Sequence, residues 1–275
     1  MLSEVLRAAI PRLLAADVPD ATRDARLLLA HATGIAVERL TLHLSDPLSP
    51  DSAARFDAAV VARTNRQPLS QITGQRLFWG RSFRVSRHVL DPRPETEILV
   101  AAALERPFEN LLDLGTGSGA ILLSCLADRP LAIGLGTDIS EPALAVARQN
   151  AADLGLSERA GFLHSDWCEA VETRFDLIVA NPPYLAAAEM AGLSPEVRNW
   201  EPHLALTPGG DGLDAYRRIA REVPDHLTTG GRLLVEIGPT QGQAVAALFA
   251  ATGLTVLGLR QDLDRRDRVV EALKP

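Results

Sequence analysis

The region beyond Pro94 alternates short apolar runs with alanine-rich stretches, and this alternation restricts the fold more than any other feature of the sequence. Each apolar run has the length and composition of a buried strand. The expected strands are 111–114, 131–137, 160–164, 175–180 and 233–237, with two more at 255–259 and 268–273. Strands that alternate with helices form a mostly parallel sheet covered by helices on both faces. We therefore expect an α/β fold with a Rossmann-like, seven-stranded sheet.

The N-terminal region has a different pattern. Apolar residues recur with helical spacing after Ser3 and again after a possible cap at Asp20, and Ser49-Pro50 is a typical start for a third helix. Aromatic and branched residues on both sides of Gly80 predict a hairpin. We expect a small helical-bundle domain at 1–68, a β-hairpin linker at 69–90 and the α/β domain at 91–275.

Composition and charge exclude several classes of protein. The net charge of -7 argues against a broad surface for duplex nucleic acid, which is normally basic. The two cysteines, Cys125 and Cys168, have no cysteine partner at metal-ligand spacing, and the six histidines are scattered, so no metal site is expected. No signal peptide and no apolar stretch of roughly 18 residues is present, so we expect a cytoplasmic protein without a membrane anchor.

A glycine loop follows the first expected strand of the α/β domain. Residues 113–119 read Asp-Leu-Gly-Thr-Gly-Ser-Gly, and a glycine loop between a strand and a helix lets the backbone approach a ligand closely. Asp113 would repel a pyrophosphate but suits a ligand with cationic amino and sulfonium groups. Asp138 ends the next strand, where a carboxylate can accept hydrogen bonds from ribose hydroxyls. Asp166-Trp167 could contact an adenine ring. This combination favours S-adenosylmethionine over a nicotinamide dinucleotide.

A second motif, Asn181-Pro182-Pro183-Tyr184, follows the expected strand 175–180. The Asn181 side-chain oxygen and the Pro182 carbonyl can accept hydrogen bonds from an amide or aromatic amine, and Tyr184 can pack on a planar group. Pro183 stiffens the turn. The motif therefore predicts a site that holds a nitrogen methyl acceptor. The following segment, 185–214, has no clear periodicity and is a plausible substrate-covering loop.

Simpler interpretations of these residues remain open at this stage. Trp167 alone would more often belong to a core, and Asp138 alone could cap the next helix. Asn-Pro-Pro alone could be a turn that ends a strand. Arg93, Glu95 and Glu97 could form a solvated helix start, because acidic residues favour the first turn.

Several segments together resemble the peptide chain release factor glutamine methyltransferase family (PrmC/HemK), over nearly the whole chain. The resemblance lies in Gln67-Pro68-Leu69, Thr73-Gly74, Phe78-Trp79, Phe83-Arg84-Val85, residues 92–97, 113–120, Asp166-Trp167, 181–184, Glu201-Pro202 and Asp267-Arg268. Asp91 departs from the family pattern, which has an aliphatic residue there. The resemblance implies a class I methyltransferase that uses S-adenosylmethionine to methylate the glutamine side-chain amide in the Gly-Gly-Gln motif of class I release factors.

The resemblance also assigns roles to residues of this chain. The residues that would contact the methyl donor are Gly115, Thr116, Gly117, Ser118, Gly119, Asp138, Trp167 and Asn181. Asp113 joins them on the charge argument given above. Asn181, Pro182, Pro183 and Tyr184 would hold the glutamine, with Asn181, Pro182 and Tyr184 acting in catalysis. The helical domain would help bind the release factor, and we expect a monomer.

Three alternatives share part of this evidence. Methyltransferases that act on adenine N6 or on a ribosomal-protein glutamine carry the same Asn-Pro-Pro-Tyr motif. The acidic charge and the lack of a basic recognition segment oppose the adenine alternative. The third alternative is a cofactor-sensing or release-factor-binding module without turnover, which fits poorly with an intact acceptor motif.

Overall fold

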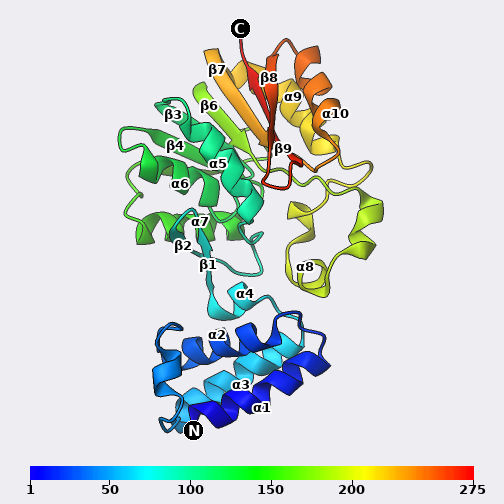
Figure 1. Cartoon of the computed structure of the whole chain (residues 1–275). Helices are drawn as coiled ribbons and strands as arrows, with labels where there is room; N and C mark the ends of the chain where they lie inside the picture. The colour runs from blue at the N-terminus through cyan, green and yellow to red at the C-terminus, as the bar shows by residue number, and fades with distance from the viewer. The chain divides into compact units, whose positions relative to one another are not determined.

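The computed structural model describes residues 1–275, and its contacts divide the chain into two compact units. The helical unit comprises Met1–Gln75 together with Ser194–Trp200, and the sheet unit comprises Arg76–Leu193 and Glu201–Pro275. Figure 1 shows the helices within residues 1–75 of the first unit in blue and cyan and the sheet of the second in green to red. The helical unit thus extends seven residues beyond the boundary expected at residue 68. It also includes a short segment that the sequence analysis placed in the α/β domain.

The helical unit is built from amphipathic helices around one apolar core. Its helices are α1 (Leu2–Ala15), α2 (Ala21–Thr33), η1 (Leu40–His43), α3 (Pro50–Thr64), α4 (Leu69–Thr73) and α8 (Pro195–Trp200). Leu13, Leu28 and Val60 are among its fully buried residues. The Ser49 hydroxyl caps α3 by accepting a hydrogen bond from the Ser52 backbone N–H, as the sequence predicts. Asp20 makes no side-chain cap bond.

Ion pairs hold α8 on this unit. The Glu196 carboxylate accepts hydrogen bonds from Arg63 and from both Nε and Nη2 of Arg66. The Trp200 indole N–H donates to the Asn65 carbonyl, and the Gln71 side-chain amide donates to the Trp200 carbonyl. Residues 194–200 therefore fold as part of the helical unit although they lie far along the chain.

We expect Asp24→Ala to destabilise the helical unit by roughly 3 kcal/mol, because it removes one partner of a buried ion pair. Asp24 accepts a hydrogen bond from Arg63 Nε at 2.7 Å, and both side chains are 7% exposed. Asp57→Ala is the matched control, since Asp57 pairs with Arg12 at the surface, where such pairs contribute about 1 kcal/mol or less. Urea unfolding followed by circular dichroism measures both. Equal losses of stability would contradict the loss of a buried ion pair as the cause.

The sheet unit contains the expected seven strands in the order β5-β4-β3-β6-β7-β9-β8. They are β3 (Asn110–Leu114), β4 (Ile133–Asp138), β5 (Ala160–His164), β6 (Phe175–Ala180), β7 (Leu227–Glu236), β8 (Thr255–Gln261) and β9 (Asp267–Leu273). Strands β3 to β7 are parallel, and β9 runs antiparallel to both β7 and β8. The start of β7 differs from the expectation at 233, because Leu227 already pairs with Phe175 before an irregularity in the register.

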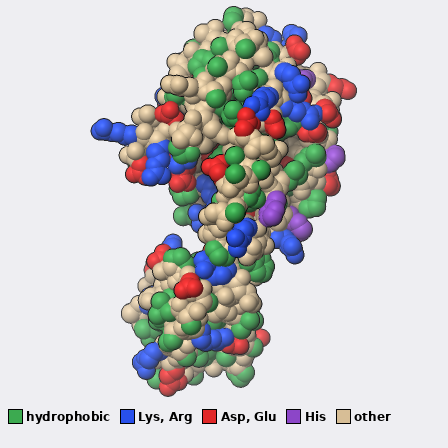
Figure 2. All heavy atoms as spheres, turned by 90° about the vertical axis from the view of Figure 1, so that its right-hand side faces the viewer, with side chains coloured by type: hydrophobic (Ala, Val, Ile, Leu, Met, Phe, Trp, Pro, Cys, Tyr) green, Lys and Arg blue, Asp and Glu red, His purple; other side chains and the backbone are tan.

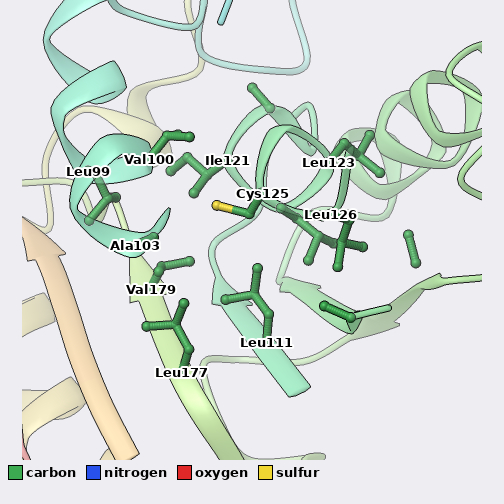
Figure 3. Packing of buried hydrophobic residues seen from close by; sticks show 14 of the residues in the cluster. Leu99, Val100, Ala103, Leu111, Ile121, Leu123, Cys125, Leu126, Leu177 and Val179 are labelled. Carbon is green, nitrogen blue, oxygen red and sulfur yellow. The ribbon is translucent and has the colours of Figure 1, made fainter. Parts of the chain in front are cut away.

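Helices cover both faces of this sheet, as predicted. They are α5 (Glu97–Leu104), α6 (Ala120–Asp128), α7 (Glu141–Asp153), α9 (Asp214–His226) and α10 (Gly242–Ala251). Figure 3 shows Leu99 and Val100 of α5 and Cys125 of α6 packed towards Val179 of β6 on one face. On the other face, residues of α9 and α10 pack on alternate residues of the same strands, such as Ile178. This alternation places two apolar cores on opposite sides of one sheet.

The predicted hairpin is present as β1 (Gln75–Phe78) and β2 (Arg81–Arg84). Phe78 and Phe83 are buried and meet edge to face at 6.1 Å. The Asn150 side chain of α7 accepts a hydrogen bond from the Arg84 backbone N–H at 2.7 Å and donates to the Arg84 carbonyl. The hairpin strand β2 is thereby fixed to the helix next to the glycine loop.

The segment 185–214 has more regular structure than the sequence predicts. It contains the short helices η3 (Ala187–Gly192) and η4 (His203–Ala205) in addition to α8. Each is six residues or shorter, which explains why helical periodicity is not visible in the sequence. None of the helices in the chain has the length and apolar character required to cross a bilayer.

Candidate active site

A cavity of about 400 Å³ lies in the sheet unit at the carboxyl ends of the central strands. Its lining includes residues that follow β3, β4 and β6. The strand order reverses between β3 and β6, and open α/β sheets bind ligands in the crevice at such a point. The residues that line it include Gly115, Thr116, Gly117, Ser118, Asp138, Asp166, Trp167, Asn181, Pro182 and Pro183. The glycine loop and the Asn-Pro-Pro turn therefore share one cavity.

Backbone hydrogen bonds hold the glycine loop in place. The Thr116 N–H donates to the Thr137 carbonyl at 2.8 Å, and the Gly117 N–H donates to Asp138 Oδ2 at 2.9 Å. Gly115, Gly117 and Gly119 all have positive φ angles, which residues with a Cβ rarely adopt. Gly115 and Gly117 line the cavity, whereas Gly119 does not and instead caps α6. The loop therefore forms a wall of the cavity, with the backbone of Gly115 and Gly117 facing it.

Asp113 lies differently from the expectation. Its side chain is fully buried and is not part of the cavity lining. Oδ2 accepts hydrogen bonds from the Thr116 hydroxyl at 2.7 Å and from the Leu122 backbone N–H, and Oδ1 has no partner. Burial raises the pKa of this carboxyl to about 7. Asp113 therefore anchors the loop to the start of α6.

Asp138 does line the cavity. One carboxylate oxygen accepts from the Gly117 N–H and the other from the Ser140 N–H, at 2.9 and 2.8 Å. Burial raises its pKa, while these two backbone hydrogen bonds lower it. The cap of α7 is Ser140, not Asp138, because the Ser140 hydroxyl accepts from the Ala143 N–H. Each oxygen retains a lone pair, so the carboxylate can accept further hydrogen bonds from ligand hydroxyls.

We expect Asp138→Ala to weaken methyl-donor binding by roughly 10- to 100-fold, the loss typical of hydrogen bonds to a charged acceptor. Asp176→Ala is a matched control, because Asp176 also braces two backbone N–H groups, those of Glu109 and Asn110, but lies outside the cavity lining. Isothermal titration calorimetry with S-adenosylmethionine measures both. If the two variants lost equal affinity, general damage to the sheet would explain the result and a contact by Asp138 would not.

Asp166 and Trp167 form another part of the wall. Arg218 of α9 donates to Asp166 Oδ2 at 2.6 Å and fixes its position. Trp167 has a φ of 55°, and a Cβ added to Gly115 would lie 3.9 Å from its ring. The indole also packs against the apolar core under α9 and α10. Trp167 is therefore both a core residue and a wall of the cavity.

Asn181, Pro182 and Pro183 line the cavity, but Tyr184 does not. The Asn181 side-chain nitrogen donates to the Thr96 hydroxyl at 3.2 Å. The Tyr184 carbonyl accepts from the Gln241 side-chain amide at 2.9 Å, and its ring lies near Gly238. Burial raises the pKa of the Tyr184 phenol. We expected the Tyr184 ring to pack on the acceptor in the cavity. In the structure the ring packs at the edge of the apolar core.

Sequence reasoning missed three groups at this site. Thr96 lines the cavity and is only 4% exposed. Arg93 also lines it and pairs at 2.6 Å with the buried Glu201, whose pKa burial raises to about 7. Arg218 holds Asp166, Glu169 and Glu222. Arg93 and Thr96 lie in the quoted stretch 92–97, which was the available signal, whereas nothing in the sequence singles out Arg218.

The residues present fit S-adenosylmethionine. The cavity volume falls in the range of about 300–1,000 Å³ that is usual for small-molecule sites. Glycine backbone, an indole face and the Asp138 carboxylate meet in it, which suits an adenosine with ribose hydroxyls and a cationic tail.

On the face in Figure 2, acidic and basic side chains are interspersed on both units.

Comparison with known proteins identifies the family. Residues 4–74 match the PrmC N-terminal domain, and residues 85–194 match the methyltransferase small domain. The chain is 62% identical to the release factor glutamine methyltransferase of Cereibacter sphaeroides, over 99% of this chain and 98% of that protein. The chain belongs to the release factor glutamine methyltransferase family. A protein of the same name from Rhodospirillum rubrum is 44% identical over 99% of this chain and 85% of its own length.

Members of this methyltransferase family use S-adenosylmethionine as the methyl donor. A solved methyltransferase from Pyrococcus furiosus has the same fold, with a TM-score of 0.54 and 17% identity over 79% of this chain and 97% of that one. The class I methyltransferase fold expected from the sequence is thereby confirmed.

Proposed function

We propose that this protein methylates the side-chain amide nitrogen, N5, of the glutamine in the Gly-Gly-Gln motif of class I release factors, with S-adenosylmethionine as donor. The observation that carries the proposal is the single cavity shared by the glycine loop and Asn181-Pro182-Pro183. The likeness to release factor glutamine methyltransferases over the full chain supports the choice of acceptor.

The residues of this protein act mainly by positioning the acceptor amide relative to the methyl donor. S-adenosylmethionine supplies an electrophilic methyl group on a sulfonium. An amide nitrogen is a weak nucleophile because its lone pair is delocalised into the carbonyl. We infer that the Asn181 side-chain oxygen and the Pro182 carbonyl accept the two N–H groups of the glutamine amide, which fixes the nitrogen and favours its pyramidal form. The amide nitrogen gains a methyl group and releases one proton, which water can accept.

We assign the contacts with the methyl donor to other residues that line the same cavity. Asp138 is placed to accept the ribose hydroxyls, and Trp167 offers an apolar face to the adenine. Gly115, Thr116, Gly117 and Ser118 supply backbone at close range. Asp113 and Gly119 support this loop from behind, through Thr116 and α6.

The helical unit is proposed to help hold the release factor. Its match to the PrmC N-terminal domain and its separate core support a role distinct from the cavity. We further propose that the protein acts as a cytoplasmic monomer and does not bind duplex nucleic acid, consistent with its net charge of -7.

Mass spectrometry of a purified class I release factor, incubated with the enzyme and S-adenosylmethionine, tests the proposal. We expect a mass increase of one methyl group on the Gly-Gly-Gln glutamine and none on a factor whose glutamine is replaced by alanine. Ribosomal protein and adenine-containing DNA are incubated in parallel. Methylation of either of these in place of the factor would overturn the proposed substrate.

A further inference from the structure

Three side chains from distant parts of the chain, Asn181, Thr96 and Glu236, interact in series behind the acceptor motif. Asn181 Nδ2 donates to Thr96 Oγ1 at 3.2 Å. The Thr96 hydroxyl also interacts with the Glu236 carboxyl, at the end of β7, and lowers its pKa. Thr96 is 4% exposed and Glu236 is 1% exposed. The series therefore runs from the half-buried Asn181 at the cavity wall into the protein interior.

The hydrogen-bonding capacity of each group gives this series a direction. When Glu236 is ionised it can only accept hydrogen bonds, so the Thr96 hydroxyl then directs its single proton toward the carboxylate. The Thr96 oxygen then offers only lone pairs to Asn181, which must present its NH₂ group there. The Asn181 side-chain oxygen is left to face the cavity that this residue lines.

This direction matters because the two ends of an asparagine amide have nearly the same shape. Packing alone cannot select one orientation, and only the hydrogen-bond network can. If the amide were flipped, its NH₂ group would meet the NH₂ group of a glutamine side chain. Two donors would then face each other with no acceptor between them, at a cost comparable to an unmade hydrogen bond.

We propose that Thr96 and Glu236 are positioning residues that hold the Asn181 side-chain oxygen toward the acceptor amide. This inference rests on the proposed function, since it concerns the same cavity and the same acceptor. Neither residue has a role in the mechanism described above, and Glu236 does not line the cavity. They act through Asn181 and do not touch the reacting atoms themselves.

The charge of Glu236 controls the direction of the series. Burial raises its pKa to about 7, and Oε2 has no hydrogen-bond partner. The charged groups near it are Arg268, Arg93 and Glu95, together with the phenols of Tyr184 and Tyr216. Both arginines are held by other carboxylates, Arg93 by Glu201 and Arg268 by Asp262. When Glu236 is protonated it can donate to Thr96, and Thr96 can then donate to a flipped Asn181 amide.

Substitution at Thr96 tests the proposal by kinetics. We expect Thr96→Val, which keeps the shape but removes the hydroxyl, to lower kcat about tenfold or more. KM for the release factor and Kd for the donor should change less than about threefold, because orientation and not binding is lost. Thr96→Ser should recover kcat to within about threefold of the wild type. Thr252→Val, at the end of α10, serves as a control for the loss of a threonine hydroxyl.

The pH dependence of kcat distinguishes positioning of the Asn181 amide by Glu236 from a purely structural role of Glu236. We expect the ratio of wild-type kcat to that of Glu236→Gln to rise with pH through about 7 and then level off, because only the wild type gains an acceptor-only carboxylate. Taking the ratio removes the contributions of Asp113 and Glu201, which titrate in the same range in both proteins. A ratio independent of pH, or a Thr96→Val enzyme with wild-type kcat, would overturn the inference.

A measurement without substrate distinguishes failure of this inference from failure of the proposed function. The ¹⁵N–¹H signals of the Asn181 side-chain amide, assigned by their loss in Asn181→Ala, should shift with pH around a midpoint near 7. That shift should vanish in Glu236→Gln. If the release factor were not methylated but the shift were present, the proposed function would fail and the positioning would stand. If the shift were absent in the wild type, the positioning would fail.

Discussion

Replacement of Asn181 by alanine should reduce kcat for release factor methylation by about 100- to 1,000-fold, the loss found when one preorganised hydrogen-bonding group is removed at a reacting centre. Asn181 is the only side chain of the Asn-Pro-Pro turn that can accept a hydrogen bond, since both prolines offer only backbone carbonyls. Without it the acceptor nitrogen keeps one of its two proposed contacts and loses its fixed direction. Donor binding should fall less than about tenfold, because the glycine loop and Asp138 remain.

Single-turnover transfer of labelled methyl groups measures the rate, and calorimetry measures donor binding in the same preparation. Gln149→Ala is the control, because Gln149 carries an exposed amide on α7 and bonds only Asp153. Unchanged methylation by the Asn181→Ala enzyme would overturn the catalytic role of Asn181, whereas no methylation by the wild type would favour a module that binds without turnover. An equally large loss of donor affinity would instead assign Asn181 to the donor.

The sequence was sufficient to predict the parts of the site that depend on local structure. Each strand has its own apolar run, and the glycine loop and the Asn-Pro-Pro turn each follow such a run directly. Parallel strands bring their carboxyl ends to one edge of a sheet, so two motifs after β3 and β6 had to be near each other. That β3 and β6 are direct neighbours, with Leu114 beside Ala180, follows from the strand order, which no local pattern specifies.

The expectations for Asp113 and Tyr184 differed from the structure because they concerned the direction of a side chain. Asp113 and Leu111 are two residues apart on one strand, so their side chains point to the same face of the sheet, the one covered by α5 and α6. Strand alternation alone could have shown this. On that face the Asp113 carboxylate accepts a hydrogen bond from the Leu122 backbone N–H. Tyr184 lies beyond the strand, where two prolines turn the chain, and its ring lies near Gly238, more than fifty residues later.

Long-range partners could not be predicted from one sequence at all. Thr96 and Asn181 are 85 residues apart, and Arg66 and Glu196 are 130 apart. No periodicity links such pairs. Glutamate at the end of a strand is ordinarily solvated, and only burial by its neighbours gives Glu236 its raised pKa. The functional part of the site that remained hidden is therefore the part held together by tertiary contacts.

Gly212→Ala should both destabilise the sheet unit and slow methyl transfer, since this glycine touches the chain directly after the acceptor motif. Gly212 has a φ of 80°, and an added Cβ would overlap the Tyr184 carbonyl oxygen and lie 3.1 Å from the Ala186 backbone nitrogen. Backbone atoms cannot rotate away as a flexible side chain can. Residues 184–186 would have to move, and the hydrogen bond from Gln241 to the Tyr184 carbonyl would be strained.

Gly209→Ala separates this steric effect from the cost of the backbone conformation. Gly209 has a similar φ of 84° in the same loop, but an added Cβ would meet nothing within 4 Å. Both variants should lose about 1–2 kcal/mol of folding stability, because alanine disfavours the left-handed backbone conformation. Only Gly212→Ala should lose a further amount of about 1–3 kcal/mol, because its Cβ overlaps neighbouring backbone atoms. Urea unfolding gives the difference in stability, and kcat shows whether the shift reaches Asn181. Equal losses of stability would mean that residues 184–186 move aside without cost. The position of the Asn-Pro-Pro turn would then depend only on Thr96 and the other residues that line the cavity.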